Sequence, residues 1–375
     1  MHPVARMRAM FEGGPVDHLV RQPFGYFPQT MDRWQREGMP AEIAQKWGEP
    51  FYRFFGYDPD VWTSQAFDLG WCEAPLVPRY EEKILRVEDN HEIVQDFIGR
   101  HCVFPIGQRQ QVMPTYIKHA VASRQDWERD VRPRLDPQSP ERWTDYAKHV
   151  AHMRSLVERG ENLHSANAIG GYMYLRSLIG PTEVLLLFYD APDLIHDMMR
   201  AWRNLVVTCM KRVQADVGPI FRLFLAEDIC FNNGPLISPA MMREFLLPYY
   251  RELYEELRNG QKETLHFEID TDGDCRPVID VYREVGADAM SPFEVASGCD
   301  VVELGRKYPE MHMRGGIDKR ILAVGPDAID RLLDRIMPPM VRRGRFIPSP
   351  DHAVPDDVSL ANYLHYRRRM QELDH

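Results

Sequence analysis

Acidic residues and one histidine recur at a particular kind of position in the second half of this chain, directly after a short apolar run. Asp270 and Asp272 follow residues 264–269 (TLHFEI), and His352 follows residues 345–350 (RFIPSP). Carboxylates and an imidazole can move protons or bind a divalent cation such as Zn²⁺, Mn²⁺ or Fe²⁺. Because alternate residues of a strand point to the same face, we expect Asp270 and Asp272 to act together.

Glu227 and Glu294 hold the equivalent place after two other apolar runs, 219–226 and 287–293. We predict that Glu227 is a fourth metal ligand or the acid that protonates a leaving group, and that Glu294 contacts the substrate. Asp228 is adjacent to Glu227, so only one of the two is expected to face a common cavity. The alternative interpretation of these acidic positions is a set of turns that cap the following helices.

Three further candidates, Tyr172, Tyr174 and Arg176, come directly after the pair Gly170-Gly171. Glycine lets a backbone approach a ligand closely, and the two tyrosines would then wall an apolar methoxy or methylamine group. Arg176 would supply a cation to a substrate carboxylate. Core packing of the tyrosines is the alternative that the sequence leaves open.

Apolar runs alternate with helical patterns through this half of the chain, which indicates parallel β/α units. One helix is expected over 241–258 with a break at Pro248, and another from 193 towards 216. Strand ends spaced by roughly 25 to 45 residues are typical of a (β/α)₈ TIM barrel, whose strands direct their carboxyl ends to one rim. An open Rossmann sheet is the runner-up, but its GxGxxG fingerprint is missing from the sequence.

The whole chain, 1–375, is interpreted as a single barrel domain whose clearest units span 160–375. Residues 1–130 are less regular, and we expect an irregular N-terminal extension that packs on the barrel and covers its mouth.

Composition excludes several functional classes. The 375 residues are 44% hydrophobic and carry a net charge of −10, which argues against nucleic acid as a partner. The longest dense apolar run, 184–189, is too short for a bilayer, and the first residues lack a secretory pattern. The six cysteines include no CxxC pair. These features predict a cytoplasmic protein with reduced thiols and no membrane partner.

Several segments resemble the uroporphyrinogen decarboxylase superfamily. They are residues 192–196 (PDLIH), 233–239 (NGPLISP), 286–288 (GAD) and 315–318 (GGID), together with the last-strand segment that ends at His352. The resemblance implies a TIM barrel and either porphyrinogen decarboxylation or corrinoid-linked methyl transfer.

Two departures from the family patterns distinguish these activities. The decarboxylases carry an Arg-Gln-Ala-Gly-Arg-Tyr motif whose arginines meet substrate carboxylates, and here residues 21–26 (RQPFGY) have Gly25 in place of the second arginine. The methyltransferase branch holds zinc through His-x-Cys and a later Cys. The matching positions are Asp270, Asp272 and His352, so the resemblance implies a divalent metal, most simply Zn²⁺, on harder ligands.

These observations predict a methyltransferase-like enzyme that demethylates a small O- or N-methylated substrate and passes the methyl group to a corrinoid on a partner protein. A carboxy-lyase acting on a tetrapyrrole or another acid is the first alternative. A non-catalytic barrel that binds a small ligand or a corrinoid is the second. The sequence does not specify the substrate or the oligomeric state.

Overall fold

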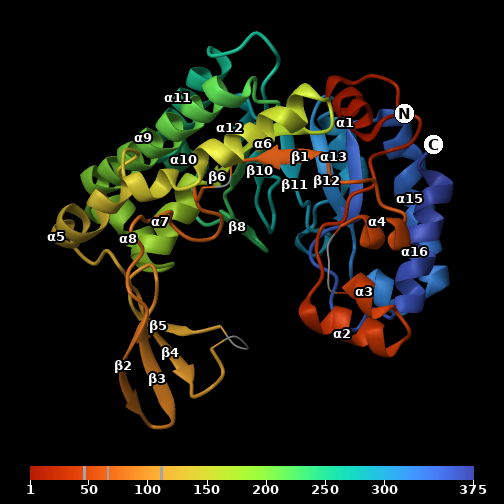
Figure 1. Cartoon of the computed structure of the whole chain (residues 1–375). Coiled ribbons are helices and arrows are strands. Elements are labelled where there is room, and N and C mark those ends of the chain that lie inside the picture. The colour runs from red at the N-terminus through yellow and green to blue at the C-terminus, as the bar shows by residue number, and fades with distance from the viewer. Residues whose placement is uncertain (45–47, 66, 110–112) are drawn as a thin grey trace.

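Seven parallel strands form a curled sheet at the centre of the chain, in the order β1-β6-β7-β10-β11-β12-β13 (Figure 1). The computed structural model describes residues 1–44, 48–65, 67–109 and 113–375. The sheet strands are β1 (Trp62–Ser64), β6 (Leu163–Ile169), β7 (Arg222–Ala226), β10 (His266–Asp270), β11 (Ala289–Ser291), β12 (His312–Ile317) and β13 (Phe346–Pro350). They follow the chain in sequence order, which is the order of a (β/α)₈ barrel. The predicted fold class is confirmed, with seven strands paired among the described residues.

Helices cover the outer face of the sheet (Figure 1). Helices between successive sheet strands include α6 (Tyr146–Glu158), α7 (Gly171–Ile179), α8 (Glu183–Asp190), α9 (Pro192–Val217), α10 (Pro239–Phe245), α11 (Leu247–Arg258), α12 (Ile279–Arg283), α13 (Val301–Lys307), α14 (Ile321–Val324) and α15 (Pro326–Arg343). The last helix, α16 (Leu360–Leu373), follows β13. The break expected at Pro248 lies between α10 and α11, since a proline ring is tolerated only in the first turn of the second helix. No helix of the described chain is long and apolar enough to cross a membrane.

The first 130 residues are more regular than the sequence suggested. They contain helices α1 (Pro3–Glu12), α2 (Pro28–Arg36), α3 (Ala41–Ala44) and α4 (Glu49–Phe55), the sheet strand β1, and a separate antiparallel sheet of β2 (Lys83–Glu88), β3 (His91–Gln95), β4 (His101–Pro105) and β5 (Thr115–Lys118). Short elements rich in aromatic residues give little periodicity, so their pattern is hard to detect in the sequence.

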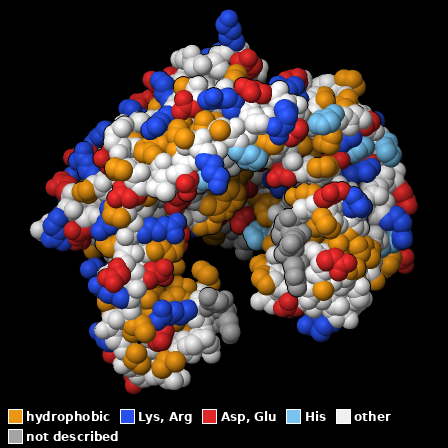
Figure 2. All heavy atoms as spheres, viewed as in Figure 1, with side chains coloured by type: hydrophobic (Ala, Val, Ile, Leu, Met, Phe, Trp, Pro, Cys, Tyr) orange, Lys and Arg blue, Asp and Glu red, His pale blue; other side chains and the backbone are white. Residues whose placement is uncertain are grey.

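This N-terminal region meets both ends of the barrel. In α1, Phe11 packs against Phe221, at the start of β7, and against His312, at the start of β12. The helix therefore closes the amino ends of the strands. At the carboxyl ends the molecule is hollowed between the β2–β5 sheet and the lobe that carries α2 and α3 (Figure 2). The extension flanks the mouth on two sides.

Cross-strand pairing determines which side chains point into the barrel. Arg222 in β7 forms an ion pair with Glu268 in β10, with Nη1 and Oε2 2.8 Å apart, and both side chains are buried. Its guanidinium also lies over the Trp62 ring, 3.9 Å from the ring centre. Residues at alternate positions share a face, so Ala226 and Asp270 point inward while Glu227 points outward to the helices.

Candidate functional site

Asp272 and His352 meet at the carboxyl ends of β10 and β13. The Nε2 atom of His352 lies 3.5 Å from Oδ2 of Asp272, and both side chains are partly exposed. The His352 ring also packs between Phe24 and Phe27, at ring-centre distances of 5.5 and 6.3 Å. The Asp272 carboxylate raises the pKa of His352, which favours the protonated imidazolium.

Glu294 and Lys319 complete the surroundings of this ion pair. The Nζ atom of Lys319 is 3.6 Å from Oε1 of Glu294, and Oε2 of Glu294 accepts the backbone N–H of Gly273 at 2.9 Å. Glu294 thereby ties the loop after β10 to the loop after β11, which positions Asp272. The predicted substrate contact of Glu294 stays a prediction.

Asp270 lies one layer deeper, at the end of β10. Its Oδ1 atom accepts a hydrogen bond from the Ser291 hydroxyl at 2.6 Å. Burial raises the pKa of Asp270 to about 7, the Ser291 hydrogen bond opposes this, and the neighbouring carboxylates of Glu268 and Asp272 add to it. The group therefore exchanges a proton near neutral pH, as a general acid or base must.

The raised pKa of Asp270 predicts a pH-dependent cost to stability. The folded state disfavours the carboxylate, so stability is lost as the pH rises from about 4 to about 7 and is level above that. Asp270→Asn keeps an acceptor for Ser291 and cannot ionise. The variant is expected to exceed the wild type in free energy of unfolding by about 2–4 kcal/mol at pH 8, with little difference near pH 4. Urea unfolding across this pH range measures the effect, and a constant difference would contradict it.

Glu227 does not join this group. It is fully buried between β7 and the helices, where Oε2 accepts the Tyr250 hydroxyl at 2.6 Å and Oε1 accepts the Tyr172 N–H at 3.4 Å. Burial raises the pKa of Glu227 to about 8. The expectation that Glu227 faces the cavity is wrong, because its strand position has the parity of the outer face.

The three candidates after Gly171 have different surroundings. Tyr174 is fully buried and donates to the carbonyl of Met198 at 3.3 Å, so it packs within the helical layer, as the alternative interpretation held. Tyr172 is equally buried, and its hydroxyl has no partner among the described residues. Arg176 forms an ion pair with Asp228 at 2.6 Å on the rim. Its charge is therefore already matched by a carboxylate of the chain.

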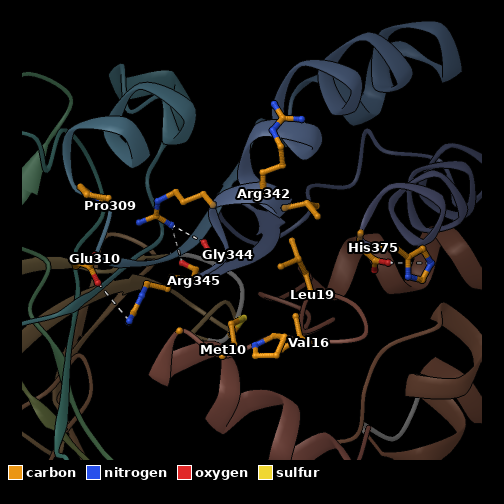
Figure 3. Close-up of a pocket in the computed structure, with 15 residues that line it drawn as sticks. Met10, Val16, Leu19, Pro309, Glu310, Arg342, Gly344, Arg345 and His375 are labelled. Carbon is orange, nitrogen blue, oxygen red and sulfur yellow. Dashed lines mark hydrogen bonds and ion pairs between the residues drawn. The ribbon is translucent and has the colours of Figure 1, made fainter.

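A cavity of about 660 Å³ lies on another part of the molecule, between α1 and the end of α15 (Figure 3). Its lining includes the basic segment that ends α15. Arg343 donates to the carbonyls of Gly305 and Tyr308, and Arg345 donates to the carbonyl of Phe11 and pairs with Glu310 at 3.5 Å. These arginines tie loops together, and the candidate residues at the barrel mouth are not part of this lining.

Comparison with known proteins identifies the family. The model described as "Uroporphyrinogen decarboxylase (URO-D)" matches residues 106–372, well over half of the chain. The chain belongs to the uroporphyrinogen decarboxylase family. Membership places it in a superfamily of enzymes that includes decarboxylases and methyltransferases.

Individual relatives of this family member are distant. It is similar to uroporphyrinogen decarboxylase of Xanthomonas campestris, at 26% identity over 39% of each chain. It is also similar to uroporphyrinogen decarboxylase of Rhodococcus erythropolis, at 30% identity over 27% of this chain and 26% of that protein. The matches thus cover less than half the length of these curated relatives.

A solved structure agrees over the full length. The fold resembles that of a methyltransferase from Methanosarcina mazei, with a TM-score of 0.58, 12% identity and 99% coverage of both chains. At that identity the likeness establishes the fold, and this is the superfamily barrel predicted from the sequence.

The arginine of the family's N-terminal motif is turned away from the mouth in this member. Arg21 forms two hydrogen bonds, of 2.6 and 2.9 Å, with the buried carboxylate of Asp374 near the C-terminus. It is therefore engaged within the chain and does not reach the rim. Together with Gly25 in place of the second arginine, this removes the motif's cationic contribution to the site.

Three residues match the zinc ligands of the methyltransferase branch. Two of them form a pair, and the third lies apart from that pair. Asp272 and His352 are in contact, but Asp270 is directed to Ser291. Across the described parts of the chain, no three His, Cys, Asp or Glu side chains are gathered as a metal site. The three side chains do not converge as a ready-made ligand set, and the divalent metal predicted at Asp270, Asp272 and His352 stays a prediction. Metal analysis of the purified wild type and of Asp272→Ala would measure whether an ion is taken up.

Sequence reasoning missed Arg314 and Phe24, both of which border the barrel interior. Phe24 touches His352, Trp62 stacks on Arg222, and Arg314 lies 5.6 Å from the Phe24 ring centre. The available signal was a charged residue, Arg314, inside the apolar run 311–317, at an alternate position from Gly316. Charge within a barrel strand indicates an interior polar function.

Proposed function

We propose that this enzyme removes a methyl group from a small O- or N-methylated compound and passes it to a corrinoid carried by a partner protein. The observation that carries the proposal is the Asp272–His352 ion pair beside Asp270, at the open mouth of the barrel. This arrangement is a proton donor held where a substrate can reach it, with a second exchangeable proton behind it.

In the proposed reaction, the bond between the methyl carbon and its oxygen or nitrogen breaks, and the bonding electron pair stays on the heteroatom. The corrinoid supplies the nucleophile that takes the methyl group. His352 donates its proton to the heteroatom as negative charge develops there, and Asp272 stabilises the imidazolium before transfer. Asp270 can then return a proton to the site, because its pKa of about 7 lies near neutral pH.

The charge at the rim supports a small substrate over a polycarboxylate. Each of four basic side chains near the carboxyl ends of the strands has an acidic partner within 4 Å. The pairs are Arg176–Asp228, Arg276–Asp274, Lys319–Glu294 and Arg320–Asp318. A porphyrinogen with many carboxylates would have to compete with these partners for each of these four cations.

A carboxy-lyase is the second candidate, because the curated relatives are named as decarboxylases. Loss of CO₂ leaves a carbanion that needs a proton, and His352 or Asp270 would supply it. The two reactions thus use the same acid and differ in which bond breaks. A barrel that binds a ligand without turnover is the remaining alternative.

The test uses the purified protein with reduced cobalamin as methyl acceptor and a panel of methoxylated and N-methylated compounds. Demethylation is expected to change the visible absorption of the corrinoid and to release the demethylated product in equal amount. Uroporphyrinogen is assayed in parallel for CO₂ release. Release of CO₂ without methyl transfer would replace the proposal with the carboxy-lyase. Saturable binding with neither product would indicate the ligand-binding barrel.

A further inference from the structure

Arg314 carries a positive charge inside the barrel without a carboxylate partner within 4.0 Å among the described residues. Its Nη2 atom donates to the carbonyl of Pro23 at 2.9 Å, whereas its Nε atom is buried and has no acceptor in the described part of the chain. This differs from Arg222, the other arginine of the interior, which is paired with Glu268. A buried guanidinium donor without an acceptor is costly unless a ligand supplies the acceptor.

A cavity of about 250 Å³ lies at this arginine, between the N-terminal segment and the inner face of the sheet. Its lining includes Gln22, Pro23, Phe24, Tyr52, Trp62 and Arg314. The indole Nε1 of Trp62 is a second buried donor that lacks an acceptor among the described residues. Two unsatisfied donors therefore border one cavity, and carboxylate oxygens are the acceptors that suit a guanidinium best.

Two acidic residues, Asp58 and Asp60, also line the cavity, but both carboxylates are engaged. Asp58 accepts from Arg6 Nη1 at 2.8 Å and from the backbone N–H of Arg21 at 2.9 Å. Asp60 accepts the backbone N–H of Trp62 at 3.1 Å. The charge of Asp58 is compensated by Arg6, which leaves Arg314 as the cation that is open to a ligand.

Phe24 links this cavity to the proposed proton donor. The Arg314 guanidinium carbon lies 5.6 Å from the Phe24 ring centre, and the His352 ring centre lies 5.5 Å from it. Arg314 and His352 thus contact the same phenyl ring. Phe24 and Trp62 also offer a ligand bound at Arg314 apolar faces.

We propose that Arg314, assisted by the Trp62 N–H, binds a carboxylate of the substrate, so that the substrate class is a small methoxylated carboxylic acid. The carboxylate lies at Arg314 and the methoxy oxygen lies towards His352. This assignment rests on the proposed demethylation for the methoxy group, but the carboxylate subsite is independent of it. It also replaces Arg176 as the cation that meets the substrate carboxylate.

Binding is tested by calorimetry on the full chain with para-methoxybenzoate, and with the neutral para-methoxybenzamide as the matched ligand. The wild type is expected to bind the carboxylate more tightly than the amide. Arg314→Met, which keeps the aliphatic stem, is expected to weaken carboxylate binding by about 10- to 100-fold and to leave amide binding nearly unchanged. Trp62→Phe is expected to weaken carboxylate binding by about 3- to 10-fold. Arg320→Met, at a 60% exposed rim arginine paired with Asp318, is the control.

Two results would overturn the proposal. One is wild-type protein that shows no saturable binding of the carboxylate, and the other is Arg314→Met protein that binds it as tightly as wild type. If Arg314→Met does not fold, as judged by circular dichroism, the Trp62→Phe variant and the carboxylate-to-amide ratio of the wild type decide the question. Carboxylate binding that depends on Arg314, without methyl transfer to cobalamin, would support this subsite and reject the proposed function. The two failures are therefore distinguishable.

Discussion

Replacement of His352 by asparagine is expected to lower kcat for the demethylation by about 10²- to 10⁴-fold, the range of a lost general acid. The imidazolium is a partly exposed proton donor, and Asp272 at 3.5 Å raises its pKa and so favours the protonated form. Asparagine retains a polar side chain of smaller size but cannot give up a proton. Steady-state kinetics with the substrate found in the corrinoid assay measures the loss.

The pH profile separates this role from a merely structural one. Activity that needs protonated His352 falls as the pH rises through the raised pKa of that histidine. Asp272→Asn removes the carboxylate that raises this pKa, so the fall is expected to move to lower pH. His152→Asn, at an exposed position of α6, should leave both kcat and the profile unchanged. A His352→Asn enzyme with more than about a tenth of the wild-type kcat would contradict the assignment.

Replacement of Arg222 by methionine is expected to lower the free energy of unfolding by about 3–5 kcal/mol. The change leaves the Glu268 carboxylate buried without its partner, since the two side chains are only 9% and 4% exposed. It also removes the hydrogen bond to Ser165 and the contact over the Trp62 ring. Urea unfolding at neutral pH measures this loss.

The double variant Arg222→Met/Glu268→Gln tests the cause. It removes both charges together, so it is expected to recover part of the stability that Arg222→Met loses. Arg53→Met is the matched control, because Arg53 and its partner Glu49 are both 78% exposed on α4. Its effect is expected to stay below about 1 kcal/mol. A double variant less stable than Arg222→Met would show that packing, and not an unpaired charge, explains the loss.

The barrel follows from local patterns in the sequence. Apolar runs ending in acidic residues mark β7, β10, β11 and β12, and their order along the chain is their order in the sheet. The same patterns place Asp270 at a strand end, since parallel strands direct their carboxyl ends to one rim. The N-terminal elements are less visible in the sequence, because short helices and an antiparallel sheet whose first strand is exposed throughout carry little periodicity.

The composition of the site depends on the tertiary structure. A period of two shows that Glu227 and Asp228 face opposite ways, but only the register with β10 shows that Glu227 faces the helices. The matching of charges is likewise a contact between distant segments. Asp228 pairs with Arg176, and Asp272 raises the pKa of His352, because different loops converge at the rim. The lack of a partner for Arg314 is also visible only in the folded chain, where no carboxylate of the described residues lies within 4.0 Å of it.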